Sequence, residues 1–175
     1  NVVVKYPQIY YRGHIADIGW LEYVSDSLTA GQPGSGVALQ ALNIGFDNSE
    51  EDYKLSGSAY VEDLGWQDYK RIDCNTTFGT TGQDRAIKAI KLNLEDMPGY
   101  SLEYRVYITG RGWQAWTSEN EIAGNTINNI EAVQFKMIYD NSKIEKIVLD
   151  KTDIVMAVDE NNKINAVVKP SDTTM

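Results

Sequence analysis

Three tryptophans share a local sequence that could bind a sugar. Trp20, Trp66 and Trp113 each follow a glycine, and they lie 46 and 47 residues apart. An indole ring can stack on the apolar face of a sugar while its N–H group finds a polar partner. The spacing therefore fits a triple carbohydrate site, but it also fits a structural residue that occurs once in each unit of an internal repeat.

We favour the structural interpretation of these tryptophans, because residues that every repeat unit contains serve the fold that the units have in common. Each tryptophan is then expected to be the large core residue of its unit. The preceding glycine would supply room or an unusual backbone dihedral at a corner of the chain. The expected structural markers are Gly19, Trp20, Gly65, Trp66, Gly112 and Trp113.

A second aromatic residue follows each tryptophan by three positions, as Tyr23, Tyr69 and Trp116. On an extended strand an odd separation puts two side chains on opposite faces, so these rings should point outward if the tryptophans point inward. A β-bulge at the glycine would reverse that parity. We predict ligand contacts by Tyr23, Tyr69, Trp116 and the neighbouring Gln114. For Trp116 the alternative is packing against residues 138–175.

The residue types argue against catalysis and metal binding. The chain has one histidine, His14, and one cysteine, Cys74. These are too few for a histidine relay, an internal disulfide or a typical zinc site. No pair of carboxylates recurs at an apolar-flanked position where burial would raise a pKa. The acidic loop at 46–54 has oxygen ligands for calcium but lacks the spacing and glycine of an EF-hand. We expect no catalytic residue, no metal and no cofactor.

The net charge of the chain limits the kinds of partner that we expect it to bind. A net charge of −9 makes its surface repulsive to nucleic acids and to anionic lipid. No apolar stretch is long enough to cross a bilayer, so membrane insertion is not expected either. Because Asn1 opens no signal peptide, we expect any export signal to lie outside this segment. The oligomeric state stays open.

Aligning the chain on Gly-Trp gives three units, at 9–46, 55–94 and 102–137. Each unit has a ring residue six positions before the tryptophan and a glycine 11 to 13 positions after it. The segments before Gly-Trp are rich in β-branched and aromatic residues, and each unit ends in an apolar alternation such as "AIKAIKLNL". Both patterns predict strands, so Gly-Trp should sit at a corner between two strands. The polar residues of that alternation should face water, and they are Lys88, Lys91 and Asn93.

This arrangement resembles a known repeat family. A ring residue, Gly-Trp, a second aromatic, "AG" or "FGT", and then "EAV" or "KAIKL" resemble the clostridial hydrophobic repeat with a conserved tryptophan, the ChW repeat. The likeness covers about residues 9–138 in three copies, of which the third is the closest and the first departs most. The resemblance implies a secreted or cell-surface bacterial protein, in which such repeats accompany enzymes or adhesion modules. It also implies a role in binding polysaccharide or other macromolecules.

The expected fold class is all-β. Units of this length cannot bury their own apolar faces, so they must share a core. We expect residues 1–138 to form a three-repeat domain in a closed pseudo-threefold arrangement, with a β-prism preferred over a β-trefoil and an open stack as the other alternative. The opening "NVVVKYP" would be a strand that closes the repeat array. Residues 139–175 contain "KIEKIVLD", "DIVMAVD" and "KINAVV", and they should form a C-terminal β-hairpin extension or begin another domain.

The expected function is that of a non-catalytic extracellular or cell-surface binding module. It would recognise polysaccharide or a surface macromolecule through loops and outward aromatics of the three units, with multivalency raising a modest affinity. One alternative is a structural or assembly element of a larger surface protein, which exposed strand edges would favour. Another is a loop-based protein inhibitor. Burial of the second aromatic in every unit would remove the basis for sugar stacking.

Overall fold

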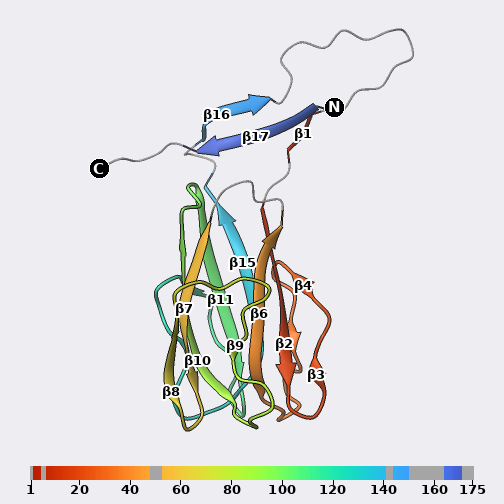
Figure 1. Ribbon diagram of the computed structural model, residues 1–175, viewed down its shortest axis with the longest axis vertical. Helices are drawn as coiled ribbons and strands as arrows, with labels where there is room; N and C mark the ends of the chain where they lie inside the picture. The colour runs from red at the N-terminus through yellow and green to blue at the C-terminus, as the bar shows by residue number, and fades with distance from the viewer. Residues whose placement is uncertain (1, 5–6, 48–52, 141–143, 150–163, 171–175) are drawn as a thin grey trace, which may run out of the picture.

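Three units with a similar order of strands make up most of the chain (Figure 1). The computed structural model describes residues 2–4, 7–47, 53–140, 144–149 and 164–170. Within these residues every regular element is a β-strand, which confirms the expected all-β class.

Each unit begins and ends with a long strand and has short strands between them. The first unit contains β2 (Gln8–Ile15), β3 (Gly19–Trp20), β4 (Val24–Ser25), β5 (Ala30–Gly31) and β6 (Leu39–Asp47). The second contains β7 (Lys54–Val61), β8 (Gly65–Tyr69), β9 (Phe78–Gly79) and β10 (Ile87–Glu95). The third contains β11 (Tyr100–Ile108), β12 (Gly112–Trp113), β13 (Thr117–Ser118), β14 (Ala123–Gly124) and β15 (Ile130–Tyr139).

The first long strand of a unit alternates between the core and the outer face, because successive side chains of a strand point in opposite directions. In β2 the odd-numbered residues from Ile9 to Ile15 are buried, and the even-numbered residues between them are half-buried. The last long strand is more variable. Lys91 of β10 is exposed as predicted, but β6 is buried from Leu39 to Phe46. A loop of the second unit lies over β6, where the Asn43 side chain donates to the carbonyl oxygen of residue 76 at 2.8 Å.

The two long strands of each unit pair antiparallel along their length, and a short strand from another unit completes each sheet. β5 of the first unit pairs with β15 of the third, β9 of the second with β6 of the first, and β14 of the third with β10 of the second. The three antiparallel sheets therefore exchange short strands in cyclic order.

Glycine is required in the exchanged strands because two backbones approach closely there. Gly31, Gly79 and Gly124 have φ values of 116°, 117° and 99°. A Cβ atom at these positions would lie 2.2, 2.4 and 2.4 Å from a carbonyl oxygen of the neighbouring long strand. These are the glycines that recur 11 to 13 residues after each tryptophan.

A shared apolar core lies between the sheets and draws residues from all three units. Two fully buried tyrosines cross it. The Tyr11 hydroxyl donates to the carbonyl oxygen of Leu28 and accepts the N–H of Phe135 at 3.0 Å. The Tyr104 hydroxyl donates to the carbonyl oxygen of Glu121 and accepts the N–H of Leu92 at 3.0 Å. Each tyrosine thereby ties its own sheet to the last long strand of another unit.

A small separate sheet contains the N-terminal strand. β1 (Val2–Val4) pairs parallel with β17 (Ile164–Pro170), and β17 pairs antiparallel with β16 (Ile144–Leu149). Figure 1 shows this sheet beyond one end of the long strands. The expectation that the N-terminal strand closes the repeat array is therefore wrong, because its partner is the C-terminal hairpin. The predicted strand "DIVMAVD", at 153–159, lies outside the described residues.

Candidate functional site

Gly-Trp begins the return strand of a tight turn in every unit, as the corner interpretation predicted. Gly19, Gly65 and Gly112 have φ values of 91°, 73° and 86°, a region that side-chain-bearing residues rarely adopt. A Cβ atom at any of them would meet nothing within 4 Å. Of the two roles considered for these glycines, the unusual dihedral is therefore the one that the turn requires.

The tryptophans lie on the outer faces of the sheets, so the expectation that they fill the core is wrong. Each stands opposite the ring residue of its first long strand. The ring centroids of His14 and Trp20 are 5.2 Å apart, and those of the other two pairs are 5.5 Å apart, all in edge-to-face geometry. Trp66 is 39% exposed. The core is filled instead by residues such as Tyr11, Tyr104 and Phe135, which belong to the opposite faces of their strands.

In the first and third units a one-residue bulge follows the tryptophan. His14 stands opposite Trp20, but four residues earlier Tyr10 stands opposite Ser25, which is five residues after Trp20. The third unit has the same offset between its paired strands. An extra residue reverses the parity of the side chains that follow it. The tryptophan and the second aromatic of these two units therefore share the outer face.

An arginine lies between the two outward rings of the first unit. The guanidinium carbon of Arg12 is 4.9 Å from the ring centroid of Trp20 and 4.5 Å from that of Tyr23. Its Nε donates to the side-chain oxygen of Asn43, which is opposite it on β6, at 2.9 Å. The centre of this outer face is thus filled by a cation held on two aromatic rings.

The third unit repeats this arrangement with other residues. Arg105 lies 4.9 Å from the Trp113 centroid and 4.7 Å from the Trp116 centroid, and its Nε donates to the Gln134 side-chain oxygen at 2.7 Å. The Nζ of Lys136 lies 4.2 Å from the Trp116 centroid. Trp116 is therefore contacted by two cations.

The second unit has no bulge at this position. β8 runs unbroken, with Trp66 opposite Tyr60 and Tyr69 opposite Gly57. The odd separation then keeps the two rings on opposite faces. Trp66 points outward, and Tyr69 points inward against Phe78, with ring centroids 4.8 Å apart.

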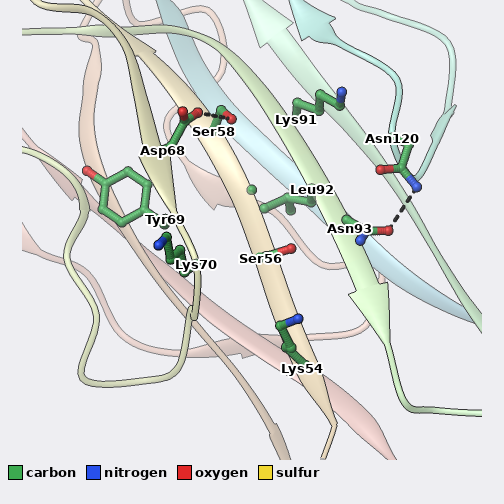
Figure 2. Close-up of a pocket in the computed structure, with 11 residues that line it drawn as sticks. Lys54, Ser56, Ser58, Asp68, Tyr69, Lys70, Lys91, Leu92, Asn93 and Asn120 are labelled. Atoms are coloured by element: carbon green, nitrogen blue, oxygen red, sulfur yellow. Dashed lines mark hydrogen bonds between the residues drawn. The ribbon is translucent and has the colours of Figure 1, made fainter.

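Ser58 occupies the position that arginine holds in the other two units, and a groove lies there. The groove has a volume of about 430 Å³, within the range of small-ligand sites. Figure 2 shows Ser56 and Ser58 on β7, with Asp68 to one side and the β10 residues Lys91 and Asn93 to the other. The full lining is Lys54, Ser56, Gly57, Ser58, Asp68, Tyr69, Lys70, Lys91, Leu92, Asn93 and Asn120.

Hydrogen bonds hold the polar groups of the groove in place. The Ser58 hydroxyl donates to Oδ1 of Asp68 at 2.6 Å. Asn120, from a loop of the third unit, donates its side-chain amide to Oδ1 of Asn93 at 2.8 Å. Lys54 binds Glu95 at 2.8 Å, and this hydrogen bond raises the pKa of Lys54 and lowers the pKa of Glu95. The groove thus offers hydroxyl, carboxylate, amide and ammonium groups on one open face.

Comparison with protein families now identifies the repeats. Two stretches of the chain, residues 14–48 and 60–96, match the family model described as ChW, Clostridial hydrophobic W. The chain contains ChW repeats. Both matched stretches begin at the ring residue opposite the tryptophan, and no catalytic domain is found with them. ChW repeats are typical of clostridial surface proteins. No curated protein and no solved structure matches the chain.

The family match covers the first two units. Residues 102–137, which the sequence pattern indicated as the closest copy, lie outside both matched stretches. The third unit nevertheless has the same strands in the same order as the first, including the bulge and the stacked arginine. The three units therefore share a strand plan, of which the family model matches two examples.

The four residues predicted to contact a ligand lie in different environments. Tyr69 borders the groove of the second ChW unit, but its ring points inward against Phe78. Tyr23 is 40% exposed and Trp116 is half-buried, and both are stacked on an arginine. The Gln114 side chain accepts the N–H of Gly124 at 2.7 Å, which ties the third unit's turn to its exchanged strand. Ligand contact by these residues stays a prediction.

The groove itself escaped the sequence analysis, although the alignment of the units contains a signal for it. The residue two positions before the ring residue is arginine in the first and third units and serine in the second. The residue opposite on the last strand is Asn43, Lys91 and Gln134 in turn. The second unit departs from the others at both positions of this pair.

The described residues contain no group of three or more His, Cys, Asp or Glu side chains placed to hold a metal ion. They also contain no helix long and apolar enough to cross a membrane. Most of the acidic loop considered for calcium, residues 48–52, lies outside the described residues.

Proposed function

We propose that the chain is a non-catalytic extracellular binding module that holds a polysaccharide across the outer face of its second sheet. The observation that carries this proposal is the groove at Ser58, whose lining residue Asp68 is two positions from the exposed Trp66 on β8. The two other sheets have the same framework, but an arginine fills the centre of each outer face. Within the described residues, the second sheet has a groove at the position that the arginine fills in the other two sheets.

The chemistry of this face suits a sugar. Trp66 and Asp68 are two residues apart on β8, so both project from the same face of the strand. In the part of the molecule that the structure describes, no arginine lies over the indole ring of Trp66, since Ser58 stands at the arginine position. The ring can then stack on a sugar, while the hydroxyl, carboxylate and amide groups of the groove bind sugar hydroxyls. Tyr69 is among the residues that line the groove, although its ring points inward against Phe78.

We also propose that the three sheets close into a pseudo-threefold, prism-like scaffold. Support comes from the cyclic exchange of β5, β9 and β14 and from the two tyrosine hydroxyls that link sheets across the core. Such a scaffold would fix the polar groups of the groove on strands instead of loops, which favours precise positioning.

Affinity electrophoresis through gels that contain soluble polysaccharides tests this function. We expect the wild-type chain to be retarded by at least one polysaccharide. Trp66→Ala should abolish the retardation, because the variant lacks the indole ring on which the sugar would stack. The matched control is Trp20→Ala, which removes the equivalent ring of a sheet whose face is filled, and it should keep the wild-type mobility.

Two results would oppose the proposal. If no polysaccharide retards the wild-type chain and light scattering shows concentration-dependent oligomers, the assembly function is favoured instead. If the chain is retarded equally with and without the Trp66 ring, the ligand binds elsewhere.

A further inference from the structure

We infer that the groove of the second sheet selects polysaccharides that carry negative charge. This inference names the ligand class of the proposed function and rests on it. The groove is lined by three lysines and one aspartate, Lys54, Lys70, Lys91 and Asp68. The chain as a whole has a net charge of −9. A positive groove in an acidic chain is a local exception that a general tendency toward solubility does not explain.

Among the described residues, two of these lysines have no ion-pair partner. In the described part of the molecule, Lys70 and Lys91 have no carboxylate oxygen within the 4.0 Å of an ion pair, and Lys91 is exposed. Other cations outside the groove do have such partners. Lys88 binds Glu62 at 2.8 Å and Lys136 binds Glu103 at 2.7 Å.

The aspartate of the groove is positioned away from Lys91. Ser58 stands between them, opposite Asp68 on one side and opposite Lys91 on the other. Two strand spacings separate the backbones of Asp68 and Lys91 by about 9–10 Å. The Asp68 carboxylate accepts the Ser58 hydroxyl at 2.6 Å instead. The ammonium of Lys91 thus stays available to a ligand.

The other units show what the second unit has exchanged. At the position of Lys91 they have the neutral amides of Asn43 and Gln134, each of which accepts the Nε–H of its stacked arginine. The second unit replaces the arginine by Ser58 and the amide by a lysine. In the second unit the positive charge therefore lies on β10, at Lys91, and not on the first long strand. It borders the space that the arginine fills in the other units.

The ligand chemistry that fits is a sugar chain with carboxylate or phosphate groups. Its charges would lie near Lys70 and Lys91, and its hydroxyls near Asp68 and Asn93. Because these lysines are exposed, each ion pair should change the affinity by a few-fold and should weaken with salt.

Isothermal titration with matched polymers tests the inference. The first pair is polygalacturonate and its methyl-esterified form, which share a backbone and differ in charge. Poly(glycerol phosphate) tests phosphate as the alternative source of charge. We expect the wild-type chain to bind at least one anionic polymer at least about tenfold more tightly than the neutral polymer, and to lose that preference as salt is raised.

Charge variants of the lysines locate the effect. Lys91→Gln and Lys70→Gln should each weaken binding to the anionic polymer about threefold to fivefold and leave binding to the neutral polymer unchanged. Lys91→Arg should retain the affinity. The control is Arg111→Gln, which removes one positive charge from an exposed turn of the third unit and should change neither.

The outcomes distinguish this inference from the proposed function. Equal affinity for charged and neutral polymers, unchanged by either lysine variant but lost with Trp66→Ala, overturns the charge selection and leaves the binding function standing. Failure of the wild-type chain to bind any of the polymers or the wider set of gel polysaccharides overturns both.

Discussion

The second unit of this chain differs from the first and third in the part of the sheet that faces outward. All three have the same Gly-Trp turn, the same edge-to-face contact between the tryptophan and a ring residue, and the same exchange of a short strand. In the first and third units a bulge brings a second aromatic beside the tryptophan, and an arginine lies between the two rings. In the second unit the strand is unbroken and Ser58 leaves a groove.

This difference shows how repeats can keep one scaffold while their surfaces diverge. The glycines and buried tyrosines that join the units belong to the turn, the exchanged strands and the core. The groove depends on a pair of opposed residues, Ser58 and Lys91, and on the absence of one extra residue in β8. We propose one site, in the second sheet, and we therefore expect one bound sugar chain per molecule in place of the multivalent binding that three equal units would give.

The largest effect on stability should come from the exchanged strands. Gly31→Ala places a Cβ atom 2.2 Å from the Glu131 carbonyl oxygen at a φ of 116°. Backbone strain and overpacking together should lower the free energy of unfolding by about 3–5 kcal/mol. Gly19→Ala, in the same unit, meets nothing within 4 Å and should cost about 1–2 kcal/mol from its φ alone. Urea unfolding of both variants measures the difference, and equal losses would contradict the close approach between units.

The next largest effect on stability should come from the buried tyrosines, Tyr11 and Tyr104, which occupy the same position in the first and third units. Tyr104→Phe removes the hydroxyl that links β11 to β10 and leaves a buried N–H and a carbonyl without this partner, which should cost about 1–3 kcal/mol. The second unit has Gly57 at the equivalent position. Ser56→Ala on the adjacent, outward-facing position is the control, and it should change the free energy of unfolding by less than about 0.5 kcal/mol.

The same tyrosines predict a dependence of stability on alkaline pH. Burial raises the pKa of Tyr11 and of Tyr104 to about 12. Because the folded pKa lies above the unfolded value of 10.0, the neutral form is favoured in the folded state. Its contribution is complete below pH 10 and is lost as the pH rises through about 12, by up to about 3 kcal/mol for each residue. Urea unfolding at a series of pH values between these limits should show a smaller loss of the free energy of unfolding for Tyr104→Phe than for the wild-type chain. An identical dependence of this free energy on pH in the two proteins would oppose this account.

The stacked arginines should have the smallest effect. Arg105→Ala loses contacts with two aromatic rings and a hydrogen bond to Gln134 on a partly exposed face, which should cost about 1–2 kcal/mol. Arg111→Ala, in an exposed turn, should stay within about 0.5 kcal/mol of the wild-type chain. Thermal unfolding compares the two, and a loss at Arg111 as large as that at Arg105 would mean that the rings do not hold the arginine.

Local patterns in the sequence predicted the repeat units, the strands and the Gly-Trp corner, because period-two alternation and glycine dihedrals are properties of short segments. The outward orientation of Lys91 followed from the same alternation. The ChW resemblance was equally local, and the family match confirms it for the first two units.

The remaining features depend on pairing between distant segments. The distance from each tryptophan to the second aromatic is three residues in all units, so nothing in that spacing reveals that two units contain a bulge and one does not. The exchanged strands are two residues long, which is too short for periodicity to appear. The N-terminal strand pairs with a strand more than 150 residues away. The face of the sheet that the tryptophans occupy and the presence of the groove both depend on the register between paired strands. The local sequence does not show this register.

The most direct test of the central claim is to exchange the pair of residues that distinguishes the sheets. Ser58→Arg with Lys91→Gln copies the Arg105 and Gln134 pair of the third unit onto the second sheet and keeps the net charge of the chain. The reverse exchange, Arg105→Ser with Gln134→Lys, is the control on the third sheet and also keeps the net charge.

Affinity for a polysaccharide that the wild-type chain binds is measured by titration, with circular dichroism to show that all three proteins are folded. We predict that the first exchange weakens binding at least about tenfold because arginine fills the groove, and that the control retains the wild-type affinity. Equal affinity of all three folded proteins would contradict the claim that the groove of the second sheet is the binding site.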